Sequence, residues 1–483
     1  MQVEGVRFTV VGAGRSGLAA ANALATRGGD VLLVEARADA ERPAGLDPRV
    51  EFTAGTNAPR PGDVAVLSPG VPEVSPVRAE IAALAGEVIG EVELFYRLSP
   101  APVLAITGTD GKSTVTTMLG AIAAAANPPR IGHAPTSSAV ATLAAPGATS
   151  APPAADFGAR PAVGGTFVGG NLGNPLCEGL DGLTPGSVVV AEISCFQLTT
   201  CVDFRPRVAV VTNIAEDHLN YHGSFAAYQA AKRRIWARMT GADTLILNAD
   251  DAYIAAWERP AAPRIRTFSL VNPDADAYFD GDTLWLVRAG RPEALMRRDE
   301  LPLLGGHNVA NALAAALAAD AWGIAPTVTR ATLMSYRPLP HRLTPVATLG
   351  GVRWVDDSKA TNANAASAGI RAINGPLILL AGGSEKDADF TAFGALVRER
   401  SRVAILFGQT RHSLARAIGA SHQTVVVETL AEAVGVARRL AEPGDTVLLG
   451  PACASFDQFK SYGHRGEVFT ALVRALEAET SAA

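Results

Sequence analysis

The sequence predicts an α/β protein of three domains with mostly parallel sheets. Short apolar runs rich in Val, Ile and Leu alternate along the chain with Ala-rich stretches of helical length. This alternation is typical of strands that are buried on both faces and connected by helices. Two Pro-containing joints, 98–102 and 337–340, divide the 483 residues into predicted domains at 1–99, 100–338 and 339–483.

The individual elements follow from the length and period of each run. Predicted strands are Phe8–Val11, Val31–Val34, Val64–Leu67, Val103–Thr107, Val188–Glu192, Val208–Thr212, Leu245–Asn248, Val352–Val355, Leu377–Leu380, Val403–Phe407 and Val447–Leu449. Predicted helices are Ser16–Arg27, Lys112–Ala126, Phe225–Met239, Asn308–Ala321, Ala363–Ile373, Leu430–Leu440 and Gly466–Glu477. Residues 127–163 contain seven prolines among small residues, and we interpret them as a flexible surface insertion.

The composition indicates an ordinary soluble protein, with 48% hydrophobic and 18% charged residues. A net charge of −5 argues against a large nucleic-acid footprint, which needs a basic surface. No apolar run approaches the ~20 residues that span a bilayer, and the first residues lead directly into a strand without a signal-peptide pattern. The four cysteines form no CxxC pair, which fits a reducing cytoplasm.

The first predicted strand leads into a glycine-rich turn, GAGRSG at 12–17. Glycines there let the backbone approach a pyrophosphate at a helix N-terminus, so the first domain is predicted to be Rossmann-like. Candidate nucleotide contacts are Gly14, Arg15, Ser16, Glu35, Ser68 and Gly70. Taken alone, this motif favours NAD or FAD, and a tight turn without a ligand is the simpler alternative.

A stronger motif follows the strand at 103–107, where GTDGKST at 108–114 opens a helix. Backbone amides can cradle the phosphates of ATP, Lys112 can neutralise their charge, and Ser113 or Thr114 can hold Mg²⁺. Ile106 replaces the first glycine of the full P-loop pattern. The second domain is therefore predicted to be P-loop-like and to bind ATP.

Four further side chains of this domain have a structural interpretation, and two of them also have a functional one. Glu192 and His218 each follow a predicted strand and could hold a metal, although a capped glutamate and a structural histidine are the commoner cases. Lys232 lies beside two arginines, and its local sequence favours a solvated basic face. Asn308 stands where a helix N-cap is expected.

The third domain carries three polar strings, each following a predicted strand: 356–362, 379–387 and 450–460. The carboxyl ends of parallel strands meet at one edge of a sheet, so the three strings are expected to define a pocket. Lys386 and Ser455 could bind carboxylates there. This arrangement predicts a Rossmann-like domain with an anion-binding site.

Together the motifs resemble the Mur ligase family, and within it the ligases that add D-glutamate. The motifs occur in family order along nearly the whole chain. They are GTDGKST (108–114), GGNLG (169–173), EISCFQL (192–198), TNIAEDH (212–218), YQAAK (228–232), GHN (306–308), PHR (340–342), DDSKATN (356–362), GGSEK (382–386) and PACASFDQFK (451–460).

The resemblance implies a cytoplasmic, monomeric ATP-dependent ligase of peptidoglycan synthesis, tied to cell division and cell shape. It implies ATP and Mg²⁺ as cofactors, UDP-N-acetylmuramoyl-L-alanine and D-glutamate as partners, and neither nucleic acid nor membrane. Implied catalytic residues are Lys112, His218 and Lys232, the last in carbamylated form. Implied ATP contacts are Gly108, Thr109, Asp110, Gly111, Lys112, Ser113, Thr114, Asn308, Arg342 and Asp357. The implied metal ligands are Ser113, Glu192, His218 and Lys232. The implied UDP-substrate contact is Asn171, and the implied D-glutamate contacts are Thr361, Lys386, Ser455, Phe456 and Tyr462.

The sequence departs from the family pattern at two positions and in one segment. Asp110 stands where an Asn is usual and adds a negative charge beside the phosphates, and Tyr462 replaces an expected Phe. Residues 127–163 form the insertion. Three rival functions remain: a dinucleotide-dependent oxidoreductase, a non-catalytic ATPase switch, and a Mur ligase for L-alanine, diaminopimelate or lysine.

Overall fold

A computed structural model describes residues 1–71, 73–126, 164–337, 340–384 and 389–482. The predicted insertion at 127–163 and the candidate Lys386 lie outside the described residues. The chain forms two compact units. The first comprises Met1–Leu301 with Ala310–Tyr336, and the second comprises Pro302–Val309 with Arg337–Ala483.

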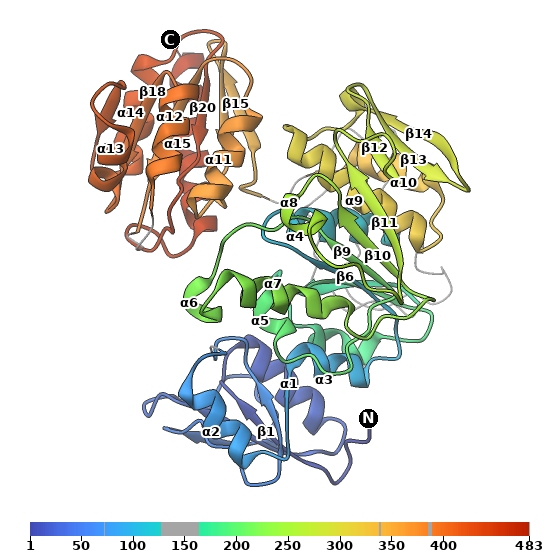
Figure 1. Cartoon of the computed structure of the whole chain (residues 1–483). Coiled ribbons are helices and arrows are strands. Elements are labelled where there is room, and N and C mark those ends of the chain that lie inside the picture. Colours follow the sequence, from blue (N-terminus) through green and yellow to red (C-terminus); the bar gives the residue numbers. More distant parts are fainter. Residues whose placement is uncertain (72, 127–163, 338–339, 385–388, 483) are drawn as a thin grey trace. The chain divides into compact units, whose positions relative to one another are not determined.

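The first unit begins with a five-stranded parallel sheet of order β3-β2-β1-β4-β5 (Figure 1). Its strands are β1 (Arg7–Val11), β2 (Asp30–Glu35), β3 (Glu51–Ala54), β4 (Val64–Leu67) and β5 (Glu87–Gly90). The chain turns to one side of β1 through β2 and to the other side through β4. The strand order therefore reverses at β1, and ligands bind at such a switch point in open α/β sheets.

A nine-stranded sheet of order β14-β13-β12-β11-β10-β9-β6-β8-β7 follows in the same unit. Its strands are β6 (Val103–Thr107), β7 (Thr166–Gly170), β8 (Val188–Glu192), β9 (Val208–Val211), β10 (Thr244–Asn248), β11 (Arg264–Ser269), β12 (Ala277–Phe279), β13 (Thr283–Arg288) and β14 (Arg291–Arg297). The strands from β7 to β12 run parallel, and β13 and β14 add an antiparallel edge. Because β6 lies between β8 and β9, the loops that follow these three strands meet at one edge.

Helices cover the faces of both sheets and connect the strands. They are α1 (Arg15–Ala25), α2 (Pro76–Leu84), α3 (Glu91–Leu98), α4 (Lys112–Ala126), α5 (Cys195–Leu198), α6 (Leu219–His222), α7 (Phe225–Arg233), α8 (Ala252–Ala255) and α10 (Pro326–Ser335), with 3-10 turns at Leu176–Gly182, Arg234–Trp236 and Arg298–Glu300. Helix α9 (Gly306–Ala321) begins in the second unit and continues in the first.

The second unit contains a six-stranded sheet of order β15-β16-β20-β17-β18-β19 (Figure 1). Only β15 is antiparallel. The strands are β15 (Thr344–Leu349), β16 (Val352–Asp356), β17 (Leu377–Gly382), β18 (Val403–Phe407), β19 (Thr424–Val426) and β20 (Thr446–Leu449). The helices are α11 (Ala363–Ala372), α12 (Thr391–Arg400), α13 (Arg411–Ile418), α14 (Leu430–Leu440) and α15 (Tyr462–Ala482).

Alternate residues of the central strands of this sheet pack into two different cores. In β17, Leu377 and Leu379 belong to one cluster of buried residues, whereas Ile378 and Leu380 belong to the other. Side chains of a strand alternate between faces, so both faces are buried under helices. This burial explains why the strand has an uninterrupted apolar sequence.

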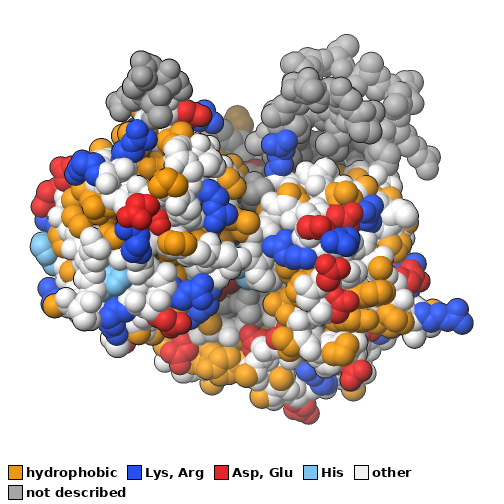
Figure 2. Space-filling view, turned by 90° about the horizontal axis from the view of Figure 1, so that it is seen from above, with side chains coloured by type: hydrophobic (Ala, Val, Ile, Leu, Met, Phe, Trp, Pro, Cys, Tyr) orange, Lys and Arg blue, Asp and Glu red, His pale blue; other side chains and the backbone are white. Residues whose placement is uncertain are grey.

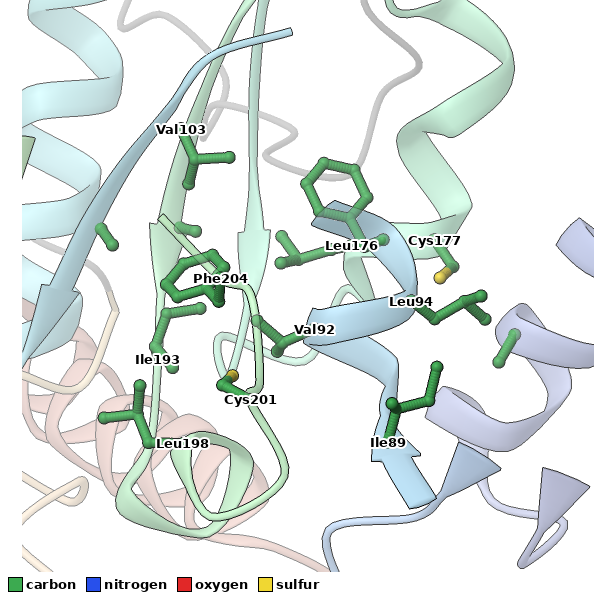
Figure 3. Packing of buried hydrophobic residues seen from close by; sticks show 14 of the residues in the cluster. Ile89, Val92, Leu94, Val103, Leu176, Cys177, Ile193, Leu198, Cys201 and Phe204 are labelled. Carbon is green, nitrogen blue, oxygen red and sulfur yellow. The ribbon is translucent and has the colours of Figure 1, made fainter. Parts of the chain in front are cut away.

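The five-stranded and nine-stranded sheets share a continuous core around β5 and α3. Figure 3 shows Val92 beside Cys201 and Leu94 beside Cys177, both from loops of the second sheet, and Ile89 belongs to the same cluster. The carboxylate of Glu93, fully buried, accepts hydrogen bonds from the backbone N–H groups of 202, 203 and 204. Burial and a satisfied carboxylate together connect the two sheets.

The prediction of an α/β fold with mostly parallel sheets is confirmed, and the predicted strands form within a few residues of their expected ends. Two local predictions are wrong. The helix predicted at Phe225–Met239 ends at Arg233 and continues as a 3-10 turn, and Asn308 is the third residue of α9 rather than its N-cap. The edge strands β3 and β19 and the hairpin β13–β14 did not stand out as apolar runs.

The other physical expectations can be compared with the described residues. All four cysteines are free and buried. No helix among the described residues is long and apolar enough to cross a bilayer. On the face shown in Figure 2, basic and acidic side chains are interspersed, and this mixture agrees with the modest net charge.

Candidate active site

The first glycine-rich turn connects β1 to α1 with little free space. A Cβ at Gly17 would clash with the carbonyl of Gly12, so the third glycine permits close packing of the helix on the strand. Gly12 adopts a positive φ of 98° and lies against Ser68. The turn after β1 and the turn after β4 therefore lie side by side, as the candidate contacts in 14–16 and at Ser68 require.

Glu35 braces this turn from the end of β2. Its Oε2 accepts a hydrogen bond from the backbone N–H of Ala13 at 2.9 Å, and its Oε1 accepts one from the Arg37 side chain at 3.2 Å. These hydrogen bonds, led by the one from Ala13, lower the pKa of Glu35 despite some burial. The carboxylate thus has a structural role in the turn, beyond the ribose recognition suggested by its position.

Arg15 connects the first turn to the GGNLG loop of the larger sheet. Its guanidinium lies 3.8 Å from the Glu178 carboxylate and passes close to Gly173. In the same loop, Asn171 donates a hydrogen bond from its side chain to Oε1 of Glu192 at 2.7 Å. The candidate contacts at Arg15 and Asn171 therefore belong to neighbouring loops of the first unit.

The loop at 108–111 has a shape that only glycine permits at its two ends. Gly108 and Gly111 have φ angles of 146° and 79°, and a Cβ at either would clash with Thr212 or Asn311, respectively. Asn213 fixes the middle of the loop. Its backbone oxygen and its side-chain Oδ1 accept the N–H groups of Thr109 and Asp110. Helix α4 begins immediately afterwards and directs its N-terminal N–H groups toward the same edge.

Two lysine ammonium groups converge on this loop. Lys112 donates to the carbonyls of Gly108 and Thr109 at 2.9 and 2.7 Å, and Lys232 donates to the carbonyl of Gly108 at 2.6 Å. Lys232 is only 1% exposed and lies 4.7 Å from the centre of the Tyr228 ring. The local interpretation of Lys232 as part of a solvated basic face is therefore wrong.

Burial changes the chemistry of Lys232. Loss of hydration, reinforced by the positive charge of Lys112, lowers its pKa from 10.5 to about 7. A large fraction of Lys232 is then a neutral amine near pH 7, whereas an exposed lysine is almost wholly protonated. Neutral amines are nucleophiles, so this side chain can react with small electrophiles.

Only one oxygen of the Glu192 carboxylate has a hydrogen-bond partner, as expected for a side chain that can bind a cation. It is 2% exposed, and its Oε2 is buried without a hydrogen-bond partner, while Oε1 is held by Asn171. A buried carboxylate oxygen without a donor is costly unless a cation binds it. Register pairs Glu192 with Ile106, which places it at the edge where α4 begins, with Ser113 as the second residue of that helix. The donor set of an acid and a hydroxyl suits Mg²⁺.

His218 adopts the left-handed conformation at φ 53° and opens α6. Its ring packs against Phe196 with centroids 4.6 Å apart, and its Nε2 lies 3.3 Å from the Asp217 carboxylate. Burial lowers the pKa of His218, and Lys232 lowers it further against the opposing effect of Asp217. Among the described residues, no three His, Cys, Asp or Glu side chains form a metal cluster by themselves.

The remaining ATP candidates lie in the second unit. Asn308 donates from its side chain to the carbonyl of Leu304 at 2.7 Å. Asp357 is buried and accepts the backbone N–H of Leu343 at 3.2 Å. Burial raises the pKa of Asp357 to about 8, although the positive charge of Arg342 opposes this shift. A carboxyl group with this pKa can donate or accept a hydrogen bond near neutral pH.

The candidates for the amino-acid site follow three adjacent strands, β16, β20 and β17. Ser455 is buried, Tyr462 is 37% exposed and Phe456 is 74% exposed, while Thr361 is partly exposed. The bridge between Ser384 and Ala454 joins the loops after β17 and β20. The structure brings these loops to one edge of the sheet, as the sequence predicted.

Several residues that support the candidate loops were missed by the sequence interpretation. Asn213 and Asn311 shape the loop at 108–111, and Arg465 is buried beneath the candidate amino-acid loops. Asn311 follows Asn308 at a spacing of one helical turn, which could have indicated it. Arg465 lies on the same face of its helix as the buried Phe469 and Val473. An apolar residue is expected at such a position, so the pattern gives no sign of a functional arginine. Asn213 left no such signal.

Three family models match parts of the chain. The Mur ligase middle domain matches residues 184–319, and the glutamate ligase domain of Mur ligases matches residues 341–453. An NAD(P)-binding Rossmann-like domain matches residues 10–41.

Curated relatives match over almost the full length. The UDP-N-acetylmuramoylalanine--D-glutamate ligase of Pelotomaculum thermopropionicum is 37% identical, with 98% of each chain covered. The ligase of the same name from Myxococcus xanthus is also 37% identical, with 99% of this chain and 100% of that one covered.

Solved structures share the fold at low identity. The MurF ligase of Thermotoga maritima in complex with ADP has a TM-score of 0.59 at 15% identity, covering 98% of this chain and 96% of that chain. A pseudomurein peptide ligase type C from Methanothermus fervidus has a TM-score of 0.58 at 18% identity, covering 98% and 100%.

Proposed function

The chain belongs to the Mur ligase family, and on that premise we propose that it uses ATP to join D-glutamate to UDP-N-acetylmuramoyl-L-alanine. The observation that carries this proposal is the full-length match to relatives that bear the name of this activity. The match includes both the phosphate-binding loop and the three polar loops of the second unit. Within the cell, the proposed role is peptidoglycan synthesis in the cytoplasm by a monomer, with consequences for division and shape.

The first half-reaction activates the substrate carboxylate. A carboxylate oxygen forms a bond to the γ-phosphorus of ATP while the bond from that phosphorus to the β–γ bridging oxygen breaks, giving an acyl phosphate and ADP. Lys112 is proposed to leave the loop carbonyls and bind the β- and γ-phosphates. Loop residues 108–114 are proposed to hold the triphosphate, with Asn308, Arg342 and Asp357 as further contacts.

The Glu192 carboxylate and the Ser113 hydroxyl are proposed to hold one Mg²⁺ ion. The unpartnered Oε2 of Glu192 supports this assignment. His218 and Lys232 are proposed to serve a second ion. When bound, Mg²⁺ neutralises phosphate charge and favours the in-line geometry of transfer. Mg²⁺ commonly completes its shell with phosphate oxygens and water, so one carboxylate is compatible with such a site.

Lys232 is proposed to be carbamylated. Its neutral amine can add to the carbon of CO₂ and release a proton, which replaces a buried ammonium with a carboxylate-like ligand. The test is ¹³C NMR of the protein with ¹³C-labelled bicarbonate at pH 8, compared with Lys232→Arg. A carbamate resonance in the wild type alone is expected, and its absence would refute the modification.

The second half-reaction forms the amide. The neutral amine of D-glutamate attacks the acyl carbon and a tetrahedral intermediate forms. The amine nitrogen gives up a proton to the solvent, and the carbon–oxygen bond to phosphate breaks. Thr361, Lys386, Ser455, Phe456 and Tyr462 are proposed to bind D-glutamate. Water must be excluded, since it would hydrolyse the acyl phosphate. The UDP moiety is proposed to contact 14–16, Glu35, Ser68, Gly70 and Asn171.

The deciding experiment measures phosphate release with ATP, Mg²⁺ and UDP-N-acetylmuramoyl-L-alanine. The panel of acceptors is D-glutamate, L-glutamate, L-alanine, meso-diaminopimelate and L-lysine. Release stimulated by D-glutamate alone, with the amide product detected by mass spectrometry, is expected. Stimulation by another amino acid would change the acceptor, and release without any acceptor would favour an ATPase switch.

An oxidoreductase is the second candidate, because residues 10–41 match an NAD(P)-binding model. This model matches residues 10–41 alone, whereas the ligase relative from Pelotomaculum thermopropionicum matches over 98% of the chain. Titration with NADH and NADPH, followed by the change in their fluorescence, tests this alternative. No binding below millimolar concentration is expected.

A further inference from the structure

Arg465 is a fully buried cation without an acidic partner. It lies near the start of α15 and is 0% exposed. Its guanidinium donates only to neutral oxygens, and among the described residues no acidic side chain pairs with it. Burial lowers the pKa of Arg465 to about 10, so the group still carries its charge at neutral pH. The negative charges of Asp457 and Asp356 oppose this shift without pairing directly with the guanidinium. A buried charge without a directly paired acid is costly, and this cost calls for a compensating role.

The acceptors of Arg465 belong to three loops that follow adjacent strands. Its Nη1 donates to the carbonyls of Gly382, Cys453 and Ala454 at 3.3, 3.1 and 3.1 Å. Its Nη2 and Nε donate to the carbonyl and the hydroxyl of Ser358 at 2.8 and 2.9 Å. These oxygens lie at the ends of β17, β20 and β16, so a single planar group connects all three loops.

Ser358 extends this network to the aromatic side of the proposed acceptor site. Its hydroxyl accepts from Arg465 and donates to the backbone carbonyl of Tyr462 at 2.8 Å. The next residue, Lys359, places its ammonium 4.0 Å from the centre of the Tyr462 ring. The position of a second cation beside the three loops therefore depends on the same buried network.

The neutral hydrogen bonds alone do not require a charged donor. A neutral amide could donate to two of these carbonyls at a lower desolvation cost. A cation beneath the loops also produces a positive potential at their exposed side, since burial in a low dielectric weakens screening. A ligand with two carboxylates, such as the acceptor of the proposed function, gains most from that potential.

We propose that Arg465 is a positioning residue for the dicarboxylic amino acid. It fixes the three loops that follow β16, β17 and β20, and its charge strengthens binding of the anionic amino acid without direct contact. The inference rests on the proposed function, because the acceptor is D-glutamate. It differs from the direct contacts proposed above, since Arg465 is buried behind them. Its signature is a selective change in KM for the amino acid.

The test measures steady-state kinetics of the full chain with each substrate varied in turn. Arg465→Lys keeps the charge and loses the planar fork, and Arg465→Met loses both. Loss of one charge-assisted hydrogen bond corresponds to about a tenfold weaker affinity. We expect KM for D-glutamate to rise about tenfold in Arg465→Lys and further in Arg465→Met. The KM values for ATP and the UDP-substrate and kcat should stay within about twofold.

Arg402→Lys is the matched control. Arg402 is another guanidinium of this sheet, which donates to the carbonyl of Leu440 and to the Asp445 carboxylate just before β20 begins. It lies at the opposite ends of the strands. We expect Arg402→Lys to lower Tm as Arg465→Lys does, with an unchanged KM for D-glutamate.

The outcomes separate the two proposals. A wild type without D-glutamate-stimulated phosphate release refutes the proposed function and this inference with it. An active wild type and a folded Arg465→Lys with an unchanged KM for D-glutamate refute this inference alone, as does an equal rise of all three KM values. Should both Arg465 variants fail to fold, Ser358→Ala tests the network through its link to Tyr462. A rise of KM for D-glutamate alone supports the proposal, and no change overturns it.

Discussion

A substitution at Glu91 tests the electrostatics of a buried carboxyl group, because its effect on the free energy of unfolding is expected to change sign with pH. It is the first residue of α3 and is 2% exposed. Its Oε1 accepts the backbone N–H of Cys177 at 2.7 Å, and its Oε2 is buried without a partner. Burial raises the pKa of Glu91 from 4.5 to about 7 despite the opposing hydrogen bonds from Cys177. The perturbation is Glu91→Gln.

The pKa values set the size of the effect. The pKa of Glu91 is higher in the folded state than in the unfolded state. Its contribution to the free energy of unfolding is therefore fully present below pH 4.5 and is lost as the pH rises through about 7. A shift from 4.5 to about 7 corresponds to about 3 kcal/mol above pH 7. Glutamine keeps an acceptor for the Cys177 N–H but buries an unpaired amide, which costs about 1 kcal/mol. Glu91→Gln should therefore stabilise by about 2 kcal/mol at pH 8 and destabilise by about 1 kcal/mol at pH 4.5.

The assay is urea unfolding followed by circular dichroism at both pH values. Glu93→Gln is the control on the same helix. The Glu93 carboxylate accepts hydrogen bonds from three backbone N–H groups and from Arg97. The NH₂ group of a glutamine there would point at some of these donors and could not accept a hydrogen bond from them. Glu93→Gln should lower the free energy of unfolding by about 3 kcal/mol at both pH values. The reasoning about Glu91 is refuted if Glu91→Gln destabilises at pH 8, or if its effect is the same at both pH values.

Three further substitutions test the two nucleotide sites. Lys112→Ala should abolish turnover while circular dichroism stays unchanged, and residual activity above about 1% would contradict its phosphate role. Gly17→Ala should weaken UDP-substrate binding in calorimetry at least about tenfold, because its Cβ meets the Gly12 carbonyl, and an unchanged affinity would contradict the role of this turn. Glu192→Gln should raise the Mg²⁺ concentration for half-maximal activity about tenfold or more, and an unchanged requirement would remove Glu192 from the metal site.

The sequence predicted the parallel core of the fold well for a physical reason. Strands buried on both faces are apolar at nearly every position, and such runs stand out in β6, β8 and β18, where only the last residues of β6 and β8 are polar. Edge strands carry no such pattern. The strand β14, RPEALMR, is mostly exposed and contains a proline, so its sequence is indistinguishable from a loop. Its place in the sheet comes from pairing with β13, which is a tertiary fact.

The candidate site was predictable where glycines and strand ends coincide. Gly108 and Gly111 need conformations that other residues rarely adopt, and their spacing reveals the loop. Asn213 could not be predicted, because an asparagine after a strand is typical of an ordinary turn. Its hydrogen bonds to Thr109 and Asp110 arise only when β9 lies beside β6.

The two residues that most misled or escaped the sequence interpretation, Lys232 and Arg465, share one property. Each is a cation in a position where its local sequence indicates either an exposed or an apolar side chain, and each is fully buried. Local rules place charges at the surface because desolvation is costly, so a fold keeps such a charge inside only if the site gains from it. For Lys232 the proposed gain is a neutral, reactive amine beside the loop at 108–111. For Arg465 it is the proposed positive potential beneath the loops that follow β16, β17 and β20. Lys232→Met should therefore abolish activity, whereas Arg465→Met should raise KM for D-glutamate. Both should damage folding less than the loss of an equally buried apolar side chain.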